Sequence, residues 1–209
     1  MITVWGGQTS RSIRVVWVLE EMGLPYRVRQ VDMLSDEEDN EFLAVNPAEY
    51  IPVMLDGDVT MVESIAMMEY LIARYGPTPL APAPDDPAFP AYQQFLHLGE
   101  AGLATLLMPV VVSRILAPEA ERRNWGANWA LDAARRRLKL VRRQLAQSPY
   151  LAGDAFTAAD ISVTYALQFG RTQGVLVLDD AEEAYLARTT GREAYRKAME
   201  RSHAGLVQA

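Results

Sequence analysis

The sequence contains no cysteine, and this absence removes several kinds of chemistry at once. A chain without thiols forms no disulfide, thiolate zinc site or iron–sulfur cluster, and it has no cysteine nucleophile. Histidine is almost as scarce, because only His97 and His203 are present and they lie far apart in the chain. We therefore expect neither a metal site nor a bound cofactor.

Long hydrophobic runs are missing as well. The longest run, Leu103–Val112, is too short to span a bilayer and contains Pro109. The N-terminal residues MITVWGG have neither the basic segment nor the apolar segment of a secretory signal. These absences predict a cytoplasmic protein that does not enter a membrane.

Positive charge is scarce in the first third of the chain. Through Gly76 there are 5 Lys/Arg against 13 Asp/Glu, whereas the rest of the chain has 15 against 14. The net charge of −7 argues against nucleic-acid binding. The basic run Arg135–Arg143 keeps Leu138 and Val141 at helical spacing, so we interpret its charges as the solvated face of a helix.

The first 76 residues have the pattern of a small α/β domain. Strands are predicted in MITVW, in PYRVRQVDM and in a hairpin around Asp56-Gly57. A helix is predicted in SIRVVWVLEEM, ended by Gly23, and another runs from Ser64, as N-cap, to Gly76. The acidic segment SDEEDNEFLAVNP predicts a short helix or turn between the second strand and the hairpin.

Residues 77–88 are rich in proline and predict a stiff linker. After the linker the sequence shows helical periodicity only, so we expect residues 89–209 to form an all-α domain of about five helices. The motif TAAD, Thr157–Asp160, predicts a capping box at the start of one of them. The helical patterns cover residues 91–112, with a bend near Pro109, and residues 118–147, 157–172 and 181–201.

Two motifs on either side of the linker resemble one known family. The first is NPAEYIPVMLDGD…TMVES, from Asn46 to Ser64, and the second is YLAGDAFTAADISV, from Tyr150 to Val163. Their order and spacing resemble the glutathione S-transferase superfamily, in its bacterial Ser/Thr type. The resemblance implies a thioredoxin-like N-terminal domain that binds glutathione, and an all-α C-terminal domain that completes the pocket for the second substrate.

The first motif also implies which residues bind glutathione. In the family the peptide bond before the motif's proline is cis, so the main chain of Ile51 would pair with glutathione like an added strand. From the residues alone, a trans proline in an ordinary turn is the alternative. Ser64 and the helix start would hold the γ-glutamyl carboxylate and Glu63 its ammonium, although Ser64 could be a simple N-cap. The implied glutathione-binding set is Tyr50, Ile51, Pro52, Glu63 and Ser64.

The chemistry implied by the family is ionisation of the glutathione thiol. Lowering the pKa of a thiol by ~2 units from its usual value takes about 2.7 kcal/mol, which a hydroxyl donor beside a helix N-terminus can supply. The segment Thr9-Ser10-Arg11-Ser12 lies at such a place, so Ser10 and Thr9 are equal candidates for the donor and Arg11 stands beside them. Each hydroxyl could instead cap the helix, and we interpret Ser12 as a cap or a bystander.

One departure from the family pattern concerns the glycyl end of glutathione. Members place a Lys, His, Gln or Arg just before the aliphatic-Pro pair, whereas this chain has Glu49 and Tyr50. Arg27 or Arg29 could substitute for the missing basic residue. The neighbouring acidic segment would repel an anionic ligand, within the limits set by solvent screening.

The resemblance therefore implies a homodimeric glutathione transferase that serves detoxification. It would direct the glutathione thiolate at a small hydrophobic electrophile, with the acceptor pocket lined by LATLLMPVVVSRIL. Two alternatives stay open. The protein could reduce disulfides or peroxides with two glutathiones, or it could be a non-catalytic, transferase-like binding protein, which Glu49 and Tyr50 favour.

Overall fold

The computed structural model describes residues 1–7, 10–33, 35, 37–122 and 124–203 of the chain. These residues fold into two units. The first consists of Met1–Thr78 together with the C-terminal segment that begins at Gly191, and the second consists of Pro79–Thr190.

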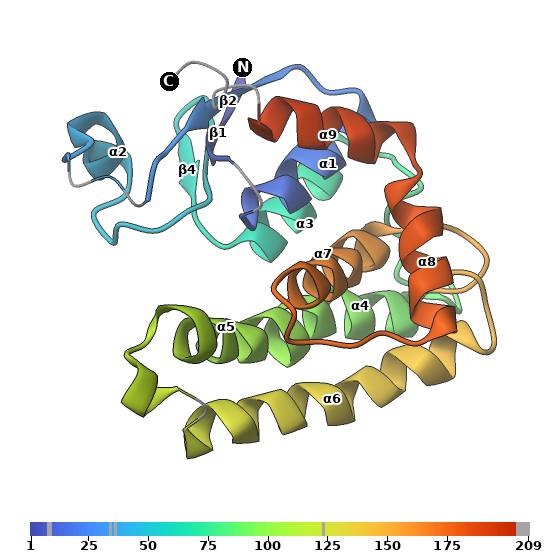
Figure 1. Cartoon of the computed structure of the whole chain (residues 1–209). Helices are drawn as coiled ribbons and strands as arrows, with labels where there is room; N and C mark the ends of the chain where they lie inside the picture. Colours follow the sequence, from blue (N-terminus) through green and yellow to red (C-terminus); the bar gives the residue numbers. More distant parts are fainter. Residues whose placement is uncertain (8–9, 34, 36, 123, 204–209) are drawn as a thin grey trace. The chain divides into compact units, whose positions relative to one another are not determined.

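A four-stranded mixed sheet forms the centre of the first unit (Figure 1). The strands lie in the order β2-β1-β3-β4, with β1 parallel to β2 and antiparallel to β3, which pairs in turn with β4. This is the thioredoxin-like arrangement. The elements are β1 (Ile2–Gly6), α1 (Ser12–Met22), β2 (Tyr26–Gln30), α2 (Asn40–Val45), β3 (Val53–Asp56), β4 (Val59–Met61), α3 (Ser64–Tyr75) and α9 (Glu193–His203).

Helix α1 is buried over most of its length, because it packs against β1, α3 and α9. Its Trp17 ring packs edge-to-face with the Tyr195 ring of α9, and the ring centroids are 4.8 Å apart. Close by, Arg192 donates two hydrogen bonds to Glu21, of 2.6 and 2.8 Å. The predicted end of α1 is confirmed, since Gly23 adopts the left-handed conformation (φ 64°) that favours glycine.

The predicted start of α3 was wrong in one detail. Ser64 is the first helical residue, and Glu63 takes the N-cap position with a positive φ of 72° and no capping bond from its side chain. The Ser64 hydroxyl bonds to a different element instead, because it accepts a hydrogen bond from Arg14 of α1. Tertiary contact therefore replaced the local capping bond that the sequence suggested.

The second unit is entirely helical. One continuous helical stretch, Phe89–Leu116, opens it and combines α4 (Phe89–His97), the π-helical segments η1 (Leu98–Ala104) and η2 (Val112–Leu116), and α5 (Thr105–Val111) between them. Pro109 lies inside α5, and η2 begins three residues later at Val112. The remaining elements are the 3-10 turn η3 (Glu119–Glu121), α6 (Trp125–Leu145), α7 (Ala158–Thr172) and α8 (Asp180–Thr190).

The stretch Phe89–Leu116 is the one segment among the described residues that is long and apolar enough to cross a membrane by length and composition. Half of its most apolar window is buried inside the protein, and core helices of soluble proteins share this character. Gly99 on this stretch lies so close to α7 that an added Cβ would come within 2.3 Å of the Ser162 Oγ. The Ser162 hydroxyl donates to the Leu96 carbonyl at 2.7 Å, which fixes the close approach of the two helices.

The end of the chain differs from the single helix predicted over residues 181–201. The structure has two helices there, separated at Gly191 and Arg192. Helix α8 belongs to the second unit, whereas α9 packs against α1 and β2 of the first. Helical periodicity continues through both helices, so the sequence alone did not reveal the break.

Candidate functional site

The sheet topology brings the ends of all four strands of the first unit together. β1 and β2 run in parallel and end at the paired residues Gly6 and Gln30. Val53 of β3 lies opposite Trp5, so the chain enters β3 at the same edge, directly after Ile51 and Pro52. β4 leaves the sheet there too, because Met61 pairs with Met54 and Glu63 follows two residues later. One sheet edge therefore collects three segments that the sequence analysis singled out.

The loop between β1 and α1 places two serine hydroxyls at the start of the helix. The Ser10 and Ser12 Oγ atoms are 2.8 Å apart. The Gly7 N–H donates to the Ser12 Oγ at 3.0 Å, and the Ser12 N–H points to the Ser10 Oγ at 3.3 Å. Ser12 is fully buried, whereas Ser10 and Arg11 are partly exposed. Thr9, the other candidate donor, lies outside the described residues.

Gly7 is required by the geometry of this loop. Its φ of +132° is one that side-chain-bearing residues rarely adopt. An added Cβ would also lie only 1.7 Å from the Gln30 Oε1. The same Gln30 side chain donates to the Ser202 carbonyl of α9 at 2.9 Å, so it connects the loop to the end of the C-terminal helix.

The segment before β3 has the main-chain form that the resemblance implies. The Ile51–Pro52 peptide bond is cis, as expected from the family rather than from the ordinary turn. Asn46 holds the segment by donating from its side-chain amide to the Tyr50 carbonyl at 2.7 Å. The Tyr50 side chain is 38% exposed, and its hydroxyl donates to the Glu63 carboxylate at 3.4 Å. Desolvation and the Glu63 charge raise the pKa of Tyr50.

Arg14 is a candidate residue to which sequence reasoning assigned no role. The structure buries it completely within α1, and its guanidinium donates to the Ser64 Oγ at 3.3 Å. Ser64 itself is 3% exposed. A signal was present, since Arg14 stands between the inward-facing Ile13 and Val16 of an apolar helix. A cation at such a position is seldom buried without a specific partner.

Arg29 is committed to another interaction. It forms an ion pair with Asp39 at 2.6 Å and a second with Glu41 at 3.2 Å, while its guanidinium lies 4.9 Å above the Trp5 ring. The hydrogen bond from the Phe42 N–H lowers the pKa of the Asp39 carboxyl, and the neighbouring Arg29 lowers it further. A basic residue that holds the start of α2 in this way is already neutralised by carboxylates. Of the two proposed substitutes for the missing basic residue, Arg27 is the exposed one.

The acidic segment lines a cavity of about 210 Å³ beside α2. Its lining includes apolar Phe42 and Leu43 and the acidic residues Asp32, Glu37, Glu38, Asp39 and Glu49. The expected excess of negative charge near the site is therefore present in the fold. Among the described residues, no group of three or more His, Asp or Glu side chains is arranged to hold a metal ion.

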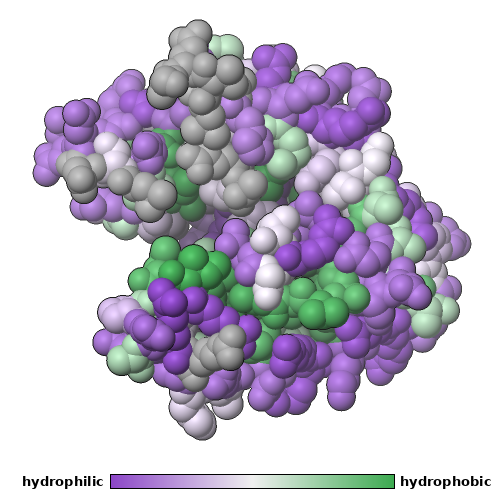
Figure 2. Space-filling model, in the orientation of Figure 1, coloured by the Kyte–Doolittle hydropathy of each residue, from purple (hydrophilic) through white to green (hydrophobic). Residues whose placement is uncertain are grey.

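The second unit exposes apolar side chains where its first helical stretch ends. Val112, Ile115 and Leu116 of η2 are 44%, 47% and 71% exposed, and Val177 is exposed in the loop after α7. Figure 2 shows hydrophobic surface over the α5–η2 region and over the segment around residues 175–178. Val112, Ile115 and Leu116 come from the predicted acceptor segment, of which Leu103, Leu107 and Val110 are core, whereas Val177 lies outside it.

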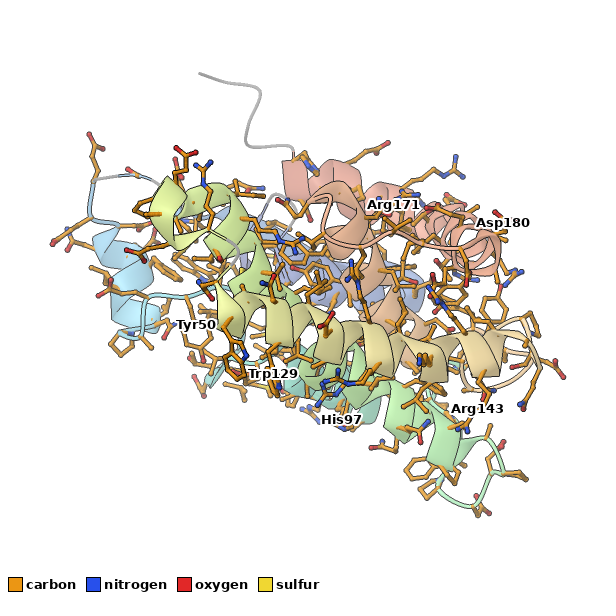
Figure 3. All side chains as sticks on the ribbon, turned by 60° about the horizontal axis from the view of Figure 1, so that its bottom comes forward. Tyr50, His97, Trp129, Arg143, Arg171 and Asp180 are labelled. Atoms are coloured by element: carbon orange, nitrogen blue, oxygen red, sulfur yellow. The ribbon has the colours of Figure 1, made fainter. Side chains whose placement is uncertain are left out.

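A different surface of the second unit carries two tryptophans. Trp125 and Trp129, one helical turn apart on α6, are 80% and 51% exposed. The buried residues of α6 lie on the opposite side of the helix, which confirms that its basic run forms a solvated face. Trp129 and Arg143 are labelled along α6 in Figure 3.

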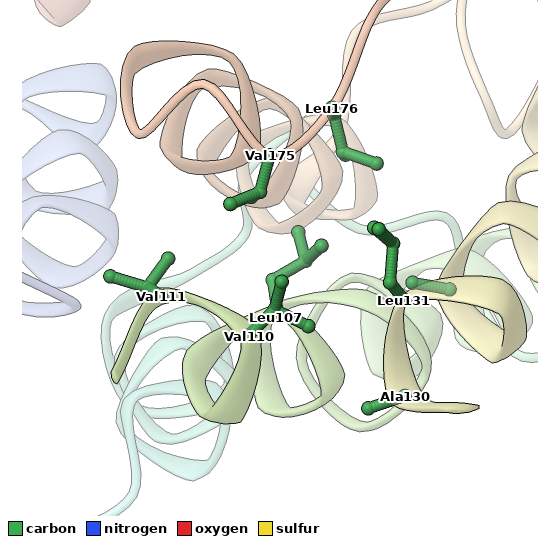
Figure 4. Close-up of a cluster of buried hydrophobic side chains, with 8 residues drawn as sticks. Leu107, Val110, Val111, Ala130, Leu131, Val175 and Leu176 are labelled. Carbon is green, nitrogen blue, oxygen red and sulfur yellow. The ribbon is translucent and has the colours of Figure 1, made fainter. Parts of the chain in front are cut away.

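One buried cluster lies between helices of the second unit (Figure 4). It joins α5, α6 and the segment after α7 in one packed core. The cluster consists of Leu107, Val110, Val111, Ala130, Leu131, Ala134, Val175 and Leu176.

Two family models match the chain in the order of its two units. Residues 10–74 match the glutathione S-transferase N-terminal domain, and residues 103–188 match the glutathione S-transferase C-terminal domain. Glutathione S-transferase 3 of Zea mays is 32% identical over 157 residues, which cover 71% of this chain and 68% of the maize protein. Glutathione S-transferase 3 of Schizosaccharomyces pombe is 28% identical over 179 residues, or 80% of this chain and 73% of the yeast protein.

Solved structures show the same similarity over almost the whole chain. A ternary complex of BphK, a bacterial GST, has a TM-score of 0.82 at 27% identity and covers 96% of this chain and 98% of its own. A theta-class glutathione S-transferase of Xanthomonas axonopodis pv. citri, solved with glutathione bound, has a TM-score of 0.75 at 26% identity. That likeness covers 95% of this chain and 96% of the Xanthomonas chain.

Proposed function

Because the chain belongs to the glutathione S-transferase family, we propose that it binds glutathione at the edge of its sheet and uses the thiolate against a small hydrophobic electrophile. The observation that carries the proposal is the partly exposed Ser10 hydroxyl at the start of α1, on the edge where Ile51, Glu63 and Ser64 also lie. Residues 1–76 would bind glutathione, and residues 77–88 would form the linker between the two domains. Residues 89–209 would supply the surface that binds the electrophile.

Glutathione would bind as a short extended peptide. The main chain of Ile51 would pair with it as an added strand, after Pro52 fixes the turn into β3. The N–H groups at the start of α3 and the Ser64 hydroxyl would hold the γ-glutamyl carboxylate, while Glu63 would hold the ammonium. Tyr50 supports this arrangement because its hydroxyl donates to Glu63 and thereby orients that carboxylate.

The chemical step would begin when the bound thiol loses its proton to water. The electron pair of the S–H bond stays on sulfur, and the Ser10 hydroxyl donates a hydrogen bond to the resulting thiolate. Helix α1 has no acidic residue in its first turn, so the positive end of its dipole and Arg11 add to this stabilisation. The thiolate then forms a carbon–sulfur bond with the electrophile, whose leaving group departs with its bonding pair.

The apolar face of η2 supports a hydrophobic acceptor. Val112, Ile115 and Leu116 expose aliphatic surface, which favours binding of an apolar molecule rather than an ion. We further propose that the protein is a cytoplasmic homodimer that serves detoxification. The exposed Trp125 and Trp129 support self-association, because large aromatic side chains are enriched at interfaces and seldom face water in pairs.

The test measures glutathione binding by calorimetry, then conjugation of an aryl halide and reduction of a model disulfide. We expect binding, conjugation, and a loss of about 100-fold in kcat/KM for Ser10→Ala, the equivalent of two pKa units in the thiol. Thr9→Ala is the competing variant, and Ser148→Ala, in the second unit, is the matched control. Absence of binding at millimolar glutathione would refute the proposal, and disulfide reduction without conjugation would favour the reductase alternative.

Sedimentation velocity tests the dimer separately. The wild type should sediment at twice the monomer mass, and Trp125→Glu with Trp129→Glu should shift it toward the monomer. Trp17 is not a suitable control because it is buried, so Arg143→Glu, on the same helix, serves as the matched exposed change. A monomeric wild type would contradict the proposal.

A further inference from the structure

We infer that Ser12, the buried serine at the start of α1, is a positioning residue that directs the Ser10 proton toward the glutathione sulfur. The inference rests on the proposed function and deepens it, because it explains how one hydroxyl of this loop becomes a committed donor. It is carried by the distances among Gly7, Ser10 and Ser12 and by the difference in burial between the two serines.

The 2.8 Å separation of the two Oγ atoms allows either hydroxyl to donate. Burial decides between them. Ser12 is fully buried, so its proton needs an acceptor inside the protein, and the Ser10 Oγ is within hydrogen-bond distance. If Ser10 donated instead, the Ser12 oxygen would accept from both Ser10 and the Gly7 N–H, and its own proton would be left buried, at a substantial cost in free energy. Ser12 therefore donates to Ser10.

This direction determines what Ser10 can do. Its oxygen accepts from the Ser12 hydroxyl and also lies 3.3 Å from the Ser12 N–H, so both of its lone pairs have donors. The Ser10 proton is then directed away from Ser12, on the side where the residue is exposed. A serine in this state is a hydrogen-bond donor and a poor base, so it stabilises a thiolate rather than removing the thiol proton.

The chain of bonds also strengthens the donor. The Gly7 N–H polarises the Ser12 hydroxyl, which in turn polarises the Ser10 hydroxyl, because linked hydrogen bonds reinforce one another in a medium of low dielectric constant. The main chain after β1 is in this way connected to the sulfur through two side chains. The positive φ at Gly7 belongs to the same device, since it sets the course of the chain that follows the N–H bonded to the Ser12 Oγ.

The experiment measures the pKa of the glutathione thiol in the binary complex, from the ultraviolet absorbance of the thiolate across a pH series. Ser12→Ala should raise this pKa by about one unit and lower kcat at neutral pH by up to about tenfold, with less than a twofold change in KM for glutathione. Ser10→Ala should raise it by about two units. In the Ser10→Ala background, Ser12→Ala should cause no further shift, since its effect passes through Ser10.

Ser162→Ala is the matched control for a purely structural effect. Ser162 is also fully buried and donates a short hydrogen bond, of 2.7 Å, but it lies in the second unit. Its removal should lower stability and leave the thiol pKa unchanged. If Ser12→Ala does not fold, Ser12→Cys keeps a weaker donor of similar shape, and the shift in thiol pKa should be smaller but in the same direction.

The outcomes separate the inference from the function on which it rests. A wild type that binds no glutathione refutes both. A wild type that binds and conjugates glutathione, with an unchanged thiol pKa in both Ser12 variants, refutes the inference alone. The same holds if Ser12→Ala and Ser10→Ala shift the pKa additively, because the two serines would then act independently. A loss in Thr9→Ala with none in Ser10→Ala would also refute it.

Discussion

Helices α1 and α7 begin with similar residues but in opposite electrostatic states. Each has a hydroxyl side chain at its start, Ser12 in α1 and Thr157 at the N-cap of α7. Helix α7 supplies its own anion, because Asp160 accepts from the Thr157 N–H at 2.8 Å and completes a capping box. Helix α1 has no acidic residue in its first turn, and Arg11 at its N-cap makes no side-chain capping bond. We call the start of α7 closed, because its own carboxylate occupies the helix end and stabilises the fold. The start of α1 is open, because its positive helix end is left for an external anion.

The closed start is also the more deeply buried of the two. Asp160 accepts hydrogen bonds from the Leu151 N–H at 2.9 Å and from the Tyr185 hydroxyl at 3.0 Å, in addition to that from Thr157. Burial nevertheless raises the pKa of Asp160 to about 6, against the lowering effect of these donors. The same local motif can therefore end in a sealed polar cluster or in an open helix start, depending on whether the chain provides the acid.

The largest expected effect comes from opening the closed start. Asp160→Ala would leave the Leu151 and Thr157 N–H groups without their acceptor, and the Tyr185 hydroxyl with only the Asp160 carbonyl at 3.4 Å. Since each buried unsatisfied group costs roughly 1–3 kcal/mol, the free energy of unfolding should fall by about 3 kcal/mol or more. Urea denaturation measures the loss. Asp154→Ala, an exposed acid in the same loop, is the matched control, and an equal effect of both variants would contradict the role of Asp160.

The second expected effect is the pH dependence that Asp160 contributes. Its pKa is higher in the folded state than in the unfolded chain, so the folded protein binds the proton more tightly. The resulting stabilisation is complete below about pH 4 and is lost as the pH rises through about 6, a change on the order of 3 kcal/mol. Urea denaturation of wild type and Asp160→Asn across this range measures it. A constant difference between the two proteins would show that Asp160 does not titrate there.

The third prediction concerns a substitution that gives the start of α1 a carboxylate, as the start of α7 has. Arg11→Glu places a carboxylate at the open helix start, where it competes with a bound thiolate for the positive helix end. We expect the pKa of bound glutathione to rise by about one unit and kcat/KM to fall about tenfold, while stability changes by a few tenths of a kcal/mol. Arg11→Gln, which only removes the positive charge, should give a smaller shift. An unchanged thiol pKa in the Glu variant would refute the comparison.

The smallest effect concerns the hydroxyl of the closed start. Thr157→Ala should lower the free energy of unfolding by about 1 kcal/mol, the usual value for an N-cap residue. Activity measured well below the melting temperature should not change, and Thr157→Ser should restore the stability. Loss of activity with unaltered thermal stability would contradict this purely structural role of Thr157.

Sequence patterns predicted the features that depend on neighbouring residues. Gly23 ends α1, Asp56-Gly57 turns the hairpin and Thr157–Asp160 caps α7, because each of these needs a few adjacent residues and a defined local conformation. The motif around Ile51-Pro52 was assigned its cis bond through the resemblance. From the two residues alone, the trans form would have been the natural expectation.

Features set by distant contacts were missed or left open. The break at Gly191 and the packing of α9 on α1 follow from contacts between the two ends of the chain, which periodicity does not report. The burial of Arg14 against Ser64 links residues 50 positions apart. Ser12 was interpreted as a cap or a bystander because its complete burial, which gives its hydrogen bond a direction, appears only once α1 is packed.

The division of the first unit between both ends of the chain has a consequence for synthesis on the ribosome. A nascent chain that has reached Thr190 already contains every residue of the second unit, whereas the first unit still lacks α9. Trp17 then has no Tyr195 to pack against, Glu21 has no Arg192, and Gln30 has no Ser202 carbonyl. The part of the protein that is translated first is therefore completed last, after the helical unit has had time to fold.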